Sequence, residues 1–450
     1  MPVPRRTMTR KEIIFSLFFV SFCLIIIPVF AGEAEQKEKE KEAESENIVL
    51  LRSGEWEIDA GGQVRLRGDF ARNQNFTDFS FTPGHHEAQF LERTRLQASV
   101  ENHALNLKAF FQLQWYGRWG GLDKRSAFDL YQGYVEWGKI LGSPVSLKGG
   151  RQEFLYGSAF FIGTNDFYNG LSWDGLKGSI NPFEGLTIDL LGSKMVKLNP
   201  RDPDIYLAGL YTTYKVYKEG SLETYLFYNK GGFPLFHREF ALVDSGQKWF
   251  TLGGRFAGKV GRFDYELEPQ FQWGKVKAVG DGRDLVRAYG GHVDLGYTFK
   301  LPWDPRLFAA YAYGSGDNNP FDGRYREFHG SVFNDSYLYG DMSVVTDQSG
   351  VTANKIHASG LQIWVGGASI KPLSKLGVTL RVHRFLAIKT PSGFSKDVGT
   401  EIDLPISYEL TKKISFIVGL NRFYTGRFFR QASGSGKNID YGYVQGQLEF

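Results

Sequence analysis

Polar and apolar residues alternate along this chain with a period of two. In the stretch WEIDAGGQVRLRGDF (56–70), the even positions are apolar or glycine, and the odd positions are polar or glycine. Successive side chains of a strand point to opposite faces, so the pattern predicts a strand with one apolar and one polar face. The final residues, YGYVQGQLEF (441–450), alternate in the same way and end on Phe450.

Segments with this alternation follow one another from residue 56 to the end, and no convincing amphipathic helix interrupts them. They begin near residues 56, 90, 105, 129, 145, 171, 186, 205, 221, 248, 262, 285, 306, 355, 375, 397, 413 and 439. Each spans roughly 9–15 residues, which is enough for a tilted strand to cross a bilayer. The sequence therefore predicts about 18 membrane-crossing strands.

The connections between these segments are alternately short and long. Short turns, such as 181–185 and 259–262, alternate along the chain with longer connections, such as 153–170, 231–247 and 316–354. Bacterial outer-membrane barrels have short periplasmic turns, long external loops and an even number of strands. We therefore expect an all-β fold, a transmembrane antiparallel up-and-down β-barrel in the outer membrane of a Gram-negative bacterium.

Closing such a barrel removes the unpaired edges that hydrocarbon would penalise. We therefore expect the last strand to pair with the first. The terminal aromatic, preceded by alternating apolar residues, also resembles the signal that the barrel-insertion machinery of the outer membrane reads.

The first 54 residues lack this alternation. Residues 1–31 combine a basic start, an apolar run (13–30) and a small residue, Ala31, which predicts a cleaved signal peptide; a retained anchor is the alternative. The sequence before Cys23 lacks the small residues of a lipidation site. Residues 32–54 are expected to be a charged periplasmic segment, in which the Glu- and Lys-rich run 33–46 is a solvated spacer or a docking segment. Residues 55–450 would form the barrel.

Composition and charge narrow the possible partners. Aromatic residues make up 16% of the chain, and the formal net charge is +4. Removing the leader takes away four basic residues and one acidic residue, which leaves about +1. This balance does not favour nucleic-acid binding, so selectivity must come from where the charges lie.

Residues between the apolar positions of each strand should line a water-filled bore. The basic residues placed there are Arg65, Arg67, Arg93, Arg95, Lys108, Lys148, Arg255 and Arg381. The acidic residues placed there are Glu136, Asp189, Asp264, Glu266, Glu268, Asp294, Glu401 and Asp403. Because arginine can hold a carboxylate with two hydrogen bonds, the four arginines of the first two strands are a candidate site for an anionic substrate.

A stretch that begins within the fifth segment carries a family resemblance. It reads GGRQEFLYGSAFFIGTNDFYNGLSWDGLKGSI (149–180), with Gly-Arg-Gln, Tyr-Gly and Trp-Asp-Gly in that order; GSGD (314–317), YGDM (339–342) and FLERTRLQA (90–98) add to it. In these motifs the chain resembles the alginate export family. The resemblance implies an outer-membrane porin that releases an anionic polyuronate through an arginine-rich bore, with loops as gates.

The Gly-Arg-Gln motif adds Arg151 to the expected bore-lining residues. Strict alternation would turn Arg151 toward lipid, whereas a bulge at Gly149-Gly150 would turn it inward.

Four functions are compatible with such a barrel. The leading hypothesis is a channel for an anionic polysaccharide or oligosaccharide, and the runner-up is a general or anion-selective porin for small solutes. An enzyme is disfavoured because the scattered histidines form no nucleophile or metal-ligand pattern, so no catalytic residue, metal or cofactor is assigned. The fourth is a plugged structural barrel. Expected partners are the anionic solute, outer-membrane lipid and lipopolysaccharide, and possible periplasmic export components.

Overall fold

The structure, a computed structural model, describes residues 48–76, 79–120, 125–166, 169–197, 204–231, 247–277, 283–319, 321–330, 336–342 and 344–450. The predicted signal peptide and the run 33–46 lie outside these residues. No helix in the described part of the chain is long and apolar enough to span a membrane.

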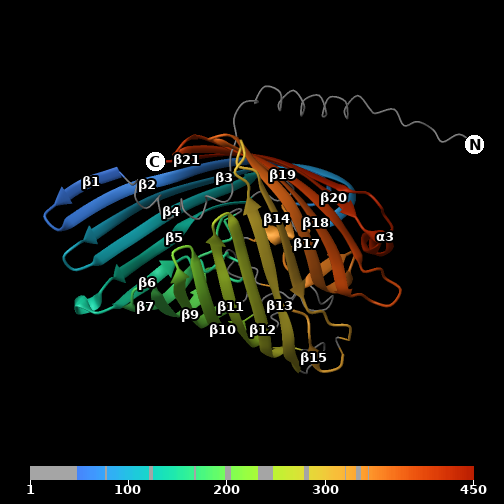
Figure 1. Cartoon of the computed structure of the whole chain (residues 1–450), viewed down its shortest axis with the longest axis horizontal. Coiled ribbons are helices and arrows are strands. Elements are labelled where there is room, and N and C mark those ends of the chain that lie inside the picture. The colour runs from blue at the N-terminus through green and yellow to red at the C-terminus, as the bar shows by residue number, and fades with distance from the viewer. Residues whose placement is uncertain are drawn as a thin grey trace, which may run out of the picture.

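Eighteen antiparallel strands form a closed ring (Figure 1). They are β2 (Trp56–Gln74), β3 (Phe81–Asn102), β4 (Leu107–Trp119), β5 (Arg125–Trp137), β6 (Val145–Gln152), β7 (Trp173–Phe183), β8 (Leu186–Met195), β9 (Ile205–Tyr217), β10 (Gly220–Gly231), β11 (Gln247–Val260), β12 (Phe263–Lys277), β13 (Arg283–Thr298), β14 (Arg306–Gly314), β17 (Ile356–Leu373), β18 (Leu376–Lys389), β19 (Asp397–Thr411), β20 (Ile414–Thr425) and β21 (Ile439–Glu449). The predicted fold class is confirmed.

The ring closes where the last strand pairs with the first. β21 lies antiparallel to β2 with Val64 opposite Leu448. At the terminus, Phe450 and Gly62 exchange two backbone hydrogen bonds of 2.7 and 2.9 Å. A side chain at position 62 would collide with the Phe450 ring, because a Cβ there would lie 2.6 Å from the ring. The terminal aromatic therefore packs on a glycine of the first barrel strand.

In the part of the chain that the structure describes, three further strands and three short helical segments accompany the ring. β1 (Ile48–Ser53) forms a hairpin with β2, so the end of the predicted 32–54 segment is a strand. β15 (Arg324–Tyr325) pairs with β13, and β16 (Gly350–Ala353) pairs with β17. The helical segments are η1 (Ile140–Gly142), η2 (Tyr337–Tyr339) and α3 (Arg427–Ser433).

The two faces of the wall differ as the alternation predicts. On β3, Leu96 is 51% exposed on the outer face, whereas its inward neighbour Arg95 is 8% exposed. On β11, Leu252 is exposed while Thr251 is fully buried. An apolar outer band and a polar interior are what a bilayer-spanning barrel requires.

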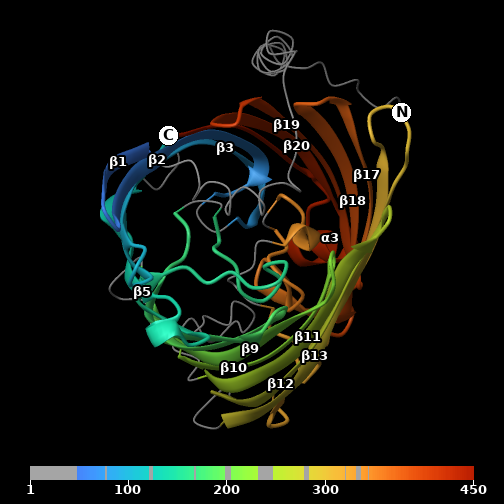
Figure 2. The same ribbon diagram turned by 60° about the vertical axis from the view of Figure 1, so that its left-hand side comes forward.

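Two connections fold into the ring and bury its polar inner face. The first inward segment (residues 153–166) follows β6, and Figure 2 shows it in teal-green inside the enclosed space. Its Phe161 and Ile162 pack against inward rings and side chains of the wall, including Tyr225 and Leu207. The second inward segment (residues 336–342 and 344–349) contains η2, and its Leu338 belongs to another buried apolar cluster. Apolar packing therefore holds both segments in the bore.

Candidate functional site

Three arginines of β2 and β3 converge on one carboxylate of the first inward segment. Arg65 donates from Nη2 to Asp166 Oδ2 at 2.6 Å and from Nη1 to the Asp166 backbone carbonyl at 2.6 Å. Arg93 donates to the other carboxylate oxygen, and Arg95 Nη1 lies 3.6 Å from that same oxygen. We call Arg65, Arg93 and Arg95 the three-arginine cluster.

Strand geometry explains why the cluster forms. Arg65 lies directly opposite Arg93 in the antiparallel register, and Arg95 is the next inward position on β3. Like charges on facing strands destabilise a sheet unless an anion neutralises them. Asp166 supplies that anion, and the arginines hold its pKa well below the usual range although burial acts in the opposite direction.

Amide and aromatic side chains of the wall orient the guanidinium groups. Arg65 Nε donates to Gln447 Oε1 at 2.8 Å, and Arg95 Nε donates to Gln114 Oε1 at 2.7 Å. The Arg95 guanidinium also lies 3.9 Å from the centre of the Tyr131 ring. These neutral contacts fix direction without cancelling charge, so the cluster keeps its preference for an anion.

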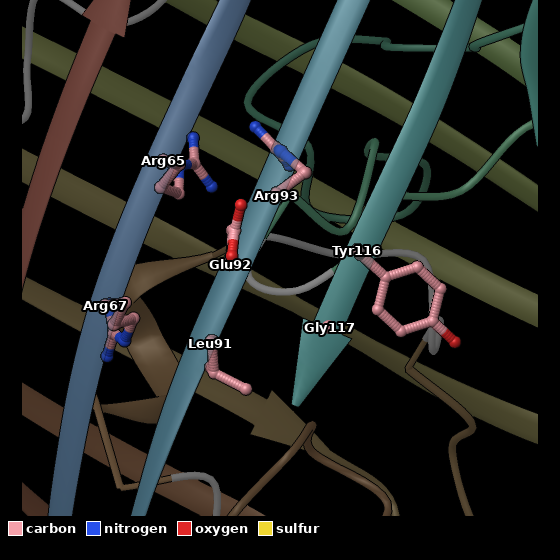
Figure 3. A pocket seen from close by; sticks show the side chains of 7 residues that line it. All are labelled: Arg65, Arg67, Leu91, Glu92, Arg93, Tyr116 and Gly117. Carbon is pink, nitrogen blue, oxygen red and sulfur yellow. The ribbon is translucent and has the colours of Figure 1, made fainter. Parts of the chain in front are cut away.

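A shallow hollow in the wall adjoins the cluster. Its lining comes from β2, β3 and β4 and consists of Arg65, Arg67, Leu91, Glu92, Arg93, Tyr116 and Gly117 (Figure 3). Figure 3 places Arg65 and Arg67 along one strand and Arg93 on its neighbour. Three guanidinium groups therefore border a single depression.

The second inward segment also places a carboxylate against an arginine. Asp341 Oδ1 accepts from Arg381 Nη1 at 3.4 Å, and its Oδ2 accepts from the Tyr443 hydroxyl at 3.2 Å. Arg67 stacks on the Tyr443 ring, with 3.7 Å between the guanidinium carbon and the ring centre. Each inward segment thus brings an aspartate to an arginine of the wall, although Glu401 and Asp403 also lie beside Asp341.

Comparison with known proteins agrees with this architecture. A family model described as alginate export matches residues 56–441. The chain belongs to the alginate export family. It is also similar to solved structures from Pseudomonas aeruginosa, although no curated protein sequence gives a significant match. OpdL has a TM-score of 0.59 and 12% identity, and OccK5 (OpdH) has a TM-score of 0.58 and 10% identity. Each comparison covers 87% of this chain and 98% of the other.

At these identities the solved structures show the fold alone, and the family match adds the type of protein. This member of the alginate export family is therefore an outer-membrane barrel of a Gram-negative bacterium, built as a channel.

The other predicted basic residues of this alginate export family protein are paired with acidic side chains. Lys108 lies 3.0 Å from Glu101. Lys148 lies 4.0 Å from Glu136 and stacks on the ring of Tyr134.

Two further arginines also have acidic partners on the bore side. Arg255 contacts Glu223 at 2.6 Å and Glu266 at 2.9 Å. Arg67 contacts Asp69 at 2.8 Å and receives support from Tyr441, so it belongs to the closing seam between β2 and β21. The predicted four-arginine patch is therefore divided: Arg67 has its own carboxylate, and the other three share Asp166.

Arg151 corrects one expectation. The register of β6 with β5 and β7 contains no shift, so no bulge turns this side chain inward. Arg151 instead pairs with Asp174 at 2.7 Å on the outer face, and its Nη1 donates to the Leu130 carbonyl at 2.9 Å. Strict alternation was the correct guide, and Gly150 allows a close approach of backbones rather than a bulge, since a Cβ there would lie 2.3 Å from the Gly133 carbonyl.

Sequence reasoning missed Asp166 and Asp341. Both lie in connections, where no periodicity indicates the direction of a side chain. Their position within the resemblance motifs GTNDFYNG and YGDM was the one available signal.

Proposed function

We propose that this protein passes an anionic polysaccharide or oligosaccharide of the polyuronate type through its bore, and that the three-arginine cluster binds the carboxylates of the moving chain. One observation carries the proposal: the cluster already holds a carboxylate, that of Asp166. A uronate residue presents the same chemical group. The membership of the alginate export family supports this substrate class.

Asp166 would act as an internal substitute for the substrate. With no uronate in the bore, its carboxylate neutralises the cluster and keeps the first inward segment across the channel. An incoming carboxylate can take the same guanidinium groups one at a time, so exchange avoids leaving buried arginines without an anion. Several such sites of moderate strength let a polymer enter and still leave.

A general or anion-selective porin for small solutes is the second candidate. The bore supports it where acidic and basic residues face each other, as in the group formed by Arg255, Glu223 and Glu266. We propose no catalytic role for the residues of the bore.

We also propose that the outer face contacts the phosphate groups of lipopolysaccharide. A row of lysines crosses neighbouring strands at one level of the wall: Lys230 on β10, Lys248 on β11 and Lys275 on β12. Lys194 on β8 extends this lysine row, because Tyr206 on β9 lies opposite both Lys230 and Lys194. Among the described residues, Asp204 is the carboxylate paired with this row, through Lys194. The row ends the strands beside the long connection 231–247, where lipid headgroups of the outer leaflet would lie.

Single-channel recording in planar bilayers tests the main proposal. The purified barrel should conduct anions in preference to cations, and oligomers of guluronate or mannuronate should block the current while a neutral dextrin of equal length should not. Equal permeability for both ions without block would favour the general porin.

A further inference from the structure

Four acidic or imidazole side chains form a compact group on the bore side of β12 and β13. Glu266 lies opposite Asp294, and Glu268 lies opposite His292. The alternate positions, including Leu267, are exposed on the outer face, so these four side chains point inward. His292 and Glu268 are 6% and 3% exposed, so the group is buried in the wall under the inward segments.

Glu266, Glu268 and His292 each use one atom to bind a neighbouring side chain of the wall. Glu268 Oε1 accepts from the Tyr225 hydroxyl at 2.6 Å. Glu266 Oε2 accepts from Arg255 Nη2 at 2.9 Å. His292 Nδ1 contacts Asp294 Oδ2. Tyr225 and Arg255 therefore orient the two glutamates from outside the group, and Asp294 orients the imidazole ring from within it.

The remaining atom of each side chain points to a common centre. His292 Nε2 lies 3.5 Å from Glu266 Oε1 and 3.6 Å from Glu268 Oε2, and the three atoms lie within 4.8 Å of one another. Each of the three is buried and makes no well-formed hydrogen bond to a described residue, although Ser158 lies close to the Glu266 carboxylate. Buried polar atoms without partners are rare in folded proteins and call for a physical explanation.

We propose that Glu266, Glu268 and His292 bind a divalent transition-metal ion of the Zn²⁺ class. Zn²⁺ binds histidine nitrogen and carboxylate oxygen at about 2.0–2.2 Å, which separates neighbouring ligand atoms of a tetrahedral site by about 3.4 Å. The distances of 3.5 and 3.6 Å from His292 Nε2 fit that separation. Asp294 on the far nitrogen fixes the ring and its tautomer, as carboxylates do behind metal-bound histidines.

Local charge also favours a cation. Among the described residues, Arg255 is the guanidinium next to the group, and it contacts Glu223, Glu266 and, at 4.0 Å, Glu268. One guanidinium is therefore shared by three carboxylates, and with Asp294 the group has an excess of negative charge unless a metal ion or an extra proton is present. Three protein ligands leave at least one coordination position, which a water molecule or a carboxylate in the bore can fill.

The site would also connect the wall to the first inward segment. The Phe160 ring of that segment packs on the His292 ring with 4.3 Å between the ring centres. A bound metal ion immobilises this imidazole, so it stabilises the surface on which the segment rests.

The test uses the full barrel in detergent, stripped with a chelator and titrated with Zn²⁺ by calorimetry and with Co²⁺ by visible absorption. Wild type should bind one ion per chain, and the Co²⁺ spectrum should show a four- or five-coordinate site. The variants His292→Gln and Glu268→Gln should lose this binding. Asp294→Asn, which leaves the ligands in place, should weaken it about 10- to 100-fold.

Asp264→Asn is the matched control, because Asp264 is an inward acid of the same strand that pairs with Arg306 instead. It should bind Zn²⁺ as wild type does. Heat-modifiable gel mobility verifies that each variant is a folded barrel. Failure of wild type to bind, or equal binding by wild type and His292→Gln, would overturn the proposal and would mean that a protonated imidazole satisfies these carboxylates. Anion selectivity is measured separately, so either proposal can fail alone.

Discussion

Asp166 Oδ2 lies 2.6 Å from Arg65 Nη2, although the two residues are 101 positions apart in the chain. The contact joins the first inward segment to the first strand of the barrel. Under the function proposed above, it places a carboxylate of the protein where a carboxylate of the cargo would bind, so the first inward segment and the proposed binding site share one contact.

Replacing the cluster arginines should reduce anion selectivity and weaken block by uronate oligomers. A hydrogen bond to a charged group contributes about 1.5–3 kcal/mol, so each of Arg65→Gln, Arg93→Gln and Arg95→Gln should raise the blocking concentration about tenfold or more. Arg287→Gln is the control, because Arg287 is opposite Trp273 on the outer face. An equal effect of Arg287→Gln would contradict the assigned role of the cluster.

Removing the internal carboxylate should have the opposite effect. In Asp166→Asn the cluster loses its resident anion, while Gln447 and Gln114 still orient Arg65 and Arg95. We expect larger anion current and tighter block by uronate oligomers, measured in the same bilayers. Glu153→Gln serves for comparison, because it alters another carboxylate near Arg95. Glu153 Oε1 lies 4.0 Å from Arg95 Nη1, whereas Asp166 Oδ1 lies 3.6 Å from the same atom. An unchanged anion current and unchanged block in Asp166→Asn would contradict the proposal that Asp166 occupies the substrate site.

Arg67 should matter for stability more than for selectivity. It neutralises Asp69, which is fully buried, at the seam where β2 meets β21. Arg67→Met leaves that carboxylate buried without a counter-ion, with only the neutral donors Tyr441 and Gln89, which costs about 3–5 kcal/mol. The double variant Arg67→Met/Asp69→Leu should recover most of the loss. Urea unfolding followed by tryptophan fluorescence measures both, and no recovery in the double variant would show that packing, not charge, dominates at the seam.

The second inward segment should dock more tightly at acidic pH. Burial is the largest cause that raises the pKa of Asp347 to about 7, and Glu327 adds to it, whereas Ser349 and His357 oppose it. A carboxyl whose folded pKa lies above its unfolded value binds the proton more tightly when folded. Its contribution to docking is therefore complete below about pH 4 and is lost as the pH rises toward 7.

Hydrogen exchange, corrected for intrinsic rates, should accordingly show residues 344–349 better protected at pH 5 than at pH 8. Asp347→Asn should remove most of that difference. Residues 153–166 provide the internal control, because the pKa of Asp166 is lowered and its contacts persist through this range. A pH effect of equal size in both segments would mean that Asp347 is not its cause.

The lysine row should bind lipopolysaccharide. The triple variant Lys230→Ser/Lys248→Ser/Lys275→Ser should retain several-fold less lipopolysaccharide after purification from outer membranes, as measured by phosphate and fatty-acid analysis. Three lysines of the opposite, short-turn end, Lys215, Lys259 and Lys413, give a matched control. Equal retention by both triple variants would exclude a specific contact.

Alternation along the chain determined which face each strand residue occupies. It placed Arg65, Arg93 and Arg255 on the bore side and predicted where most strands begin. The need to close a barrel in hydrocarbon then predicted the pairing of the last strand with the first. Alternation also predicted the outward direction of Arg151. Only a bulge at Gly149-Gly150 would have turned this side chain inward, and the register contains no such bulge. The face that a side chain occupies is a local property, because the side chains of a pleated strand alternate between its two faces independently of the strands that pair with it.

Tertiary structure alone decided which charges meet. Asp166 and Asp341 reach the arginines because Phe161, Ile162 and Leu338 bury their side chains against the inner wall and so direct two connections through the bore. Likewise, the register of β12 with β13 sets Glu268 opposite His292. Connections have no repeating geometry, so their paths depend on packing between residues far apart in the chain, which no local pattern records.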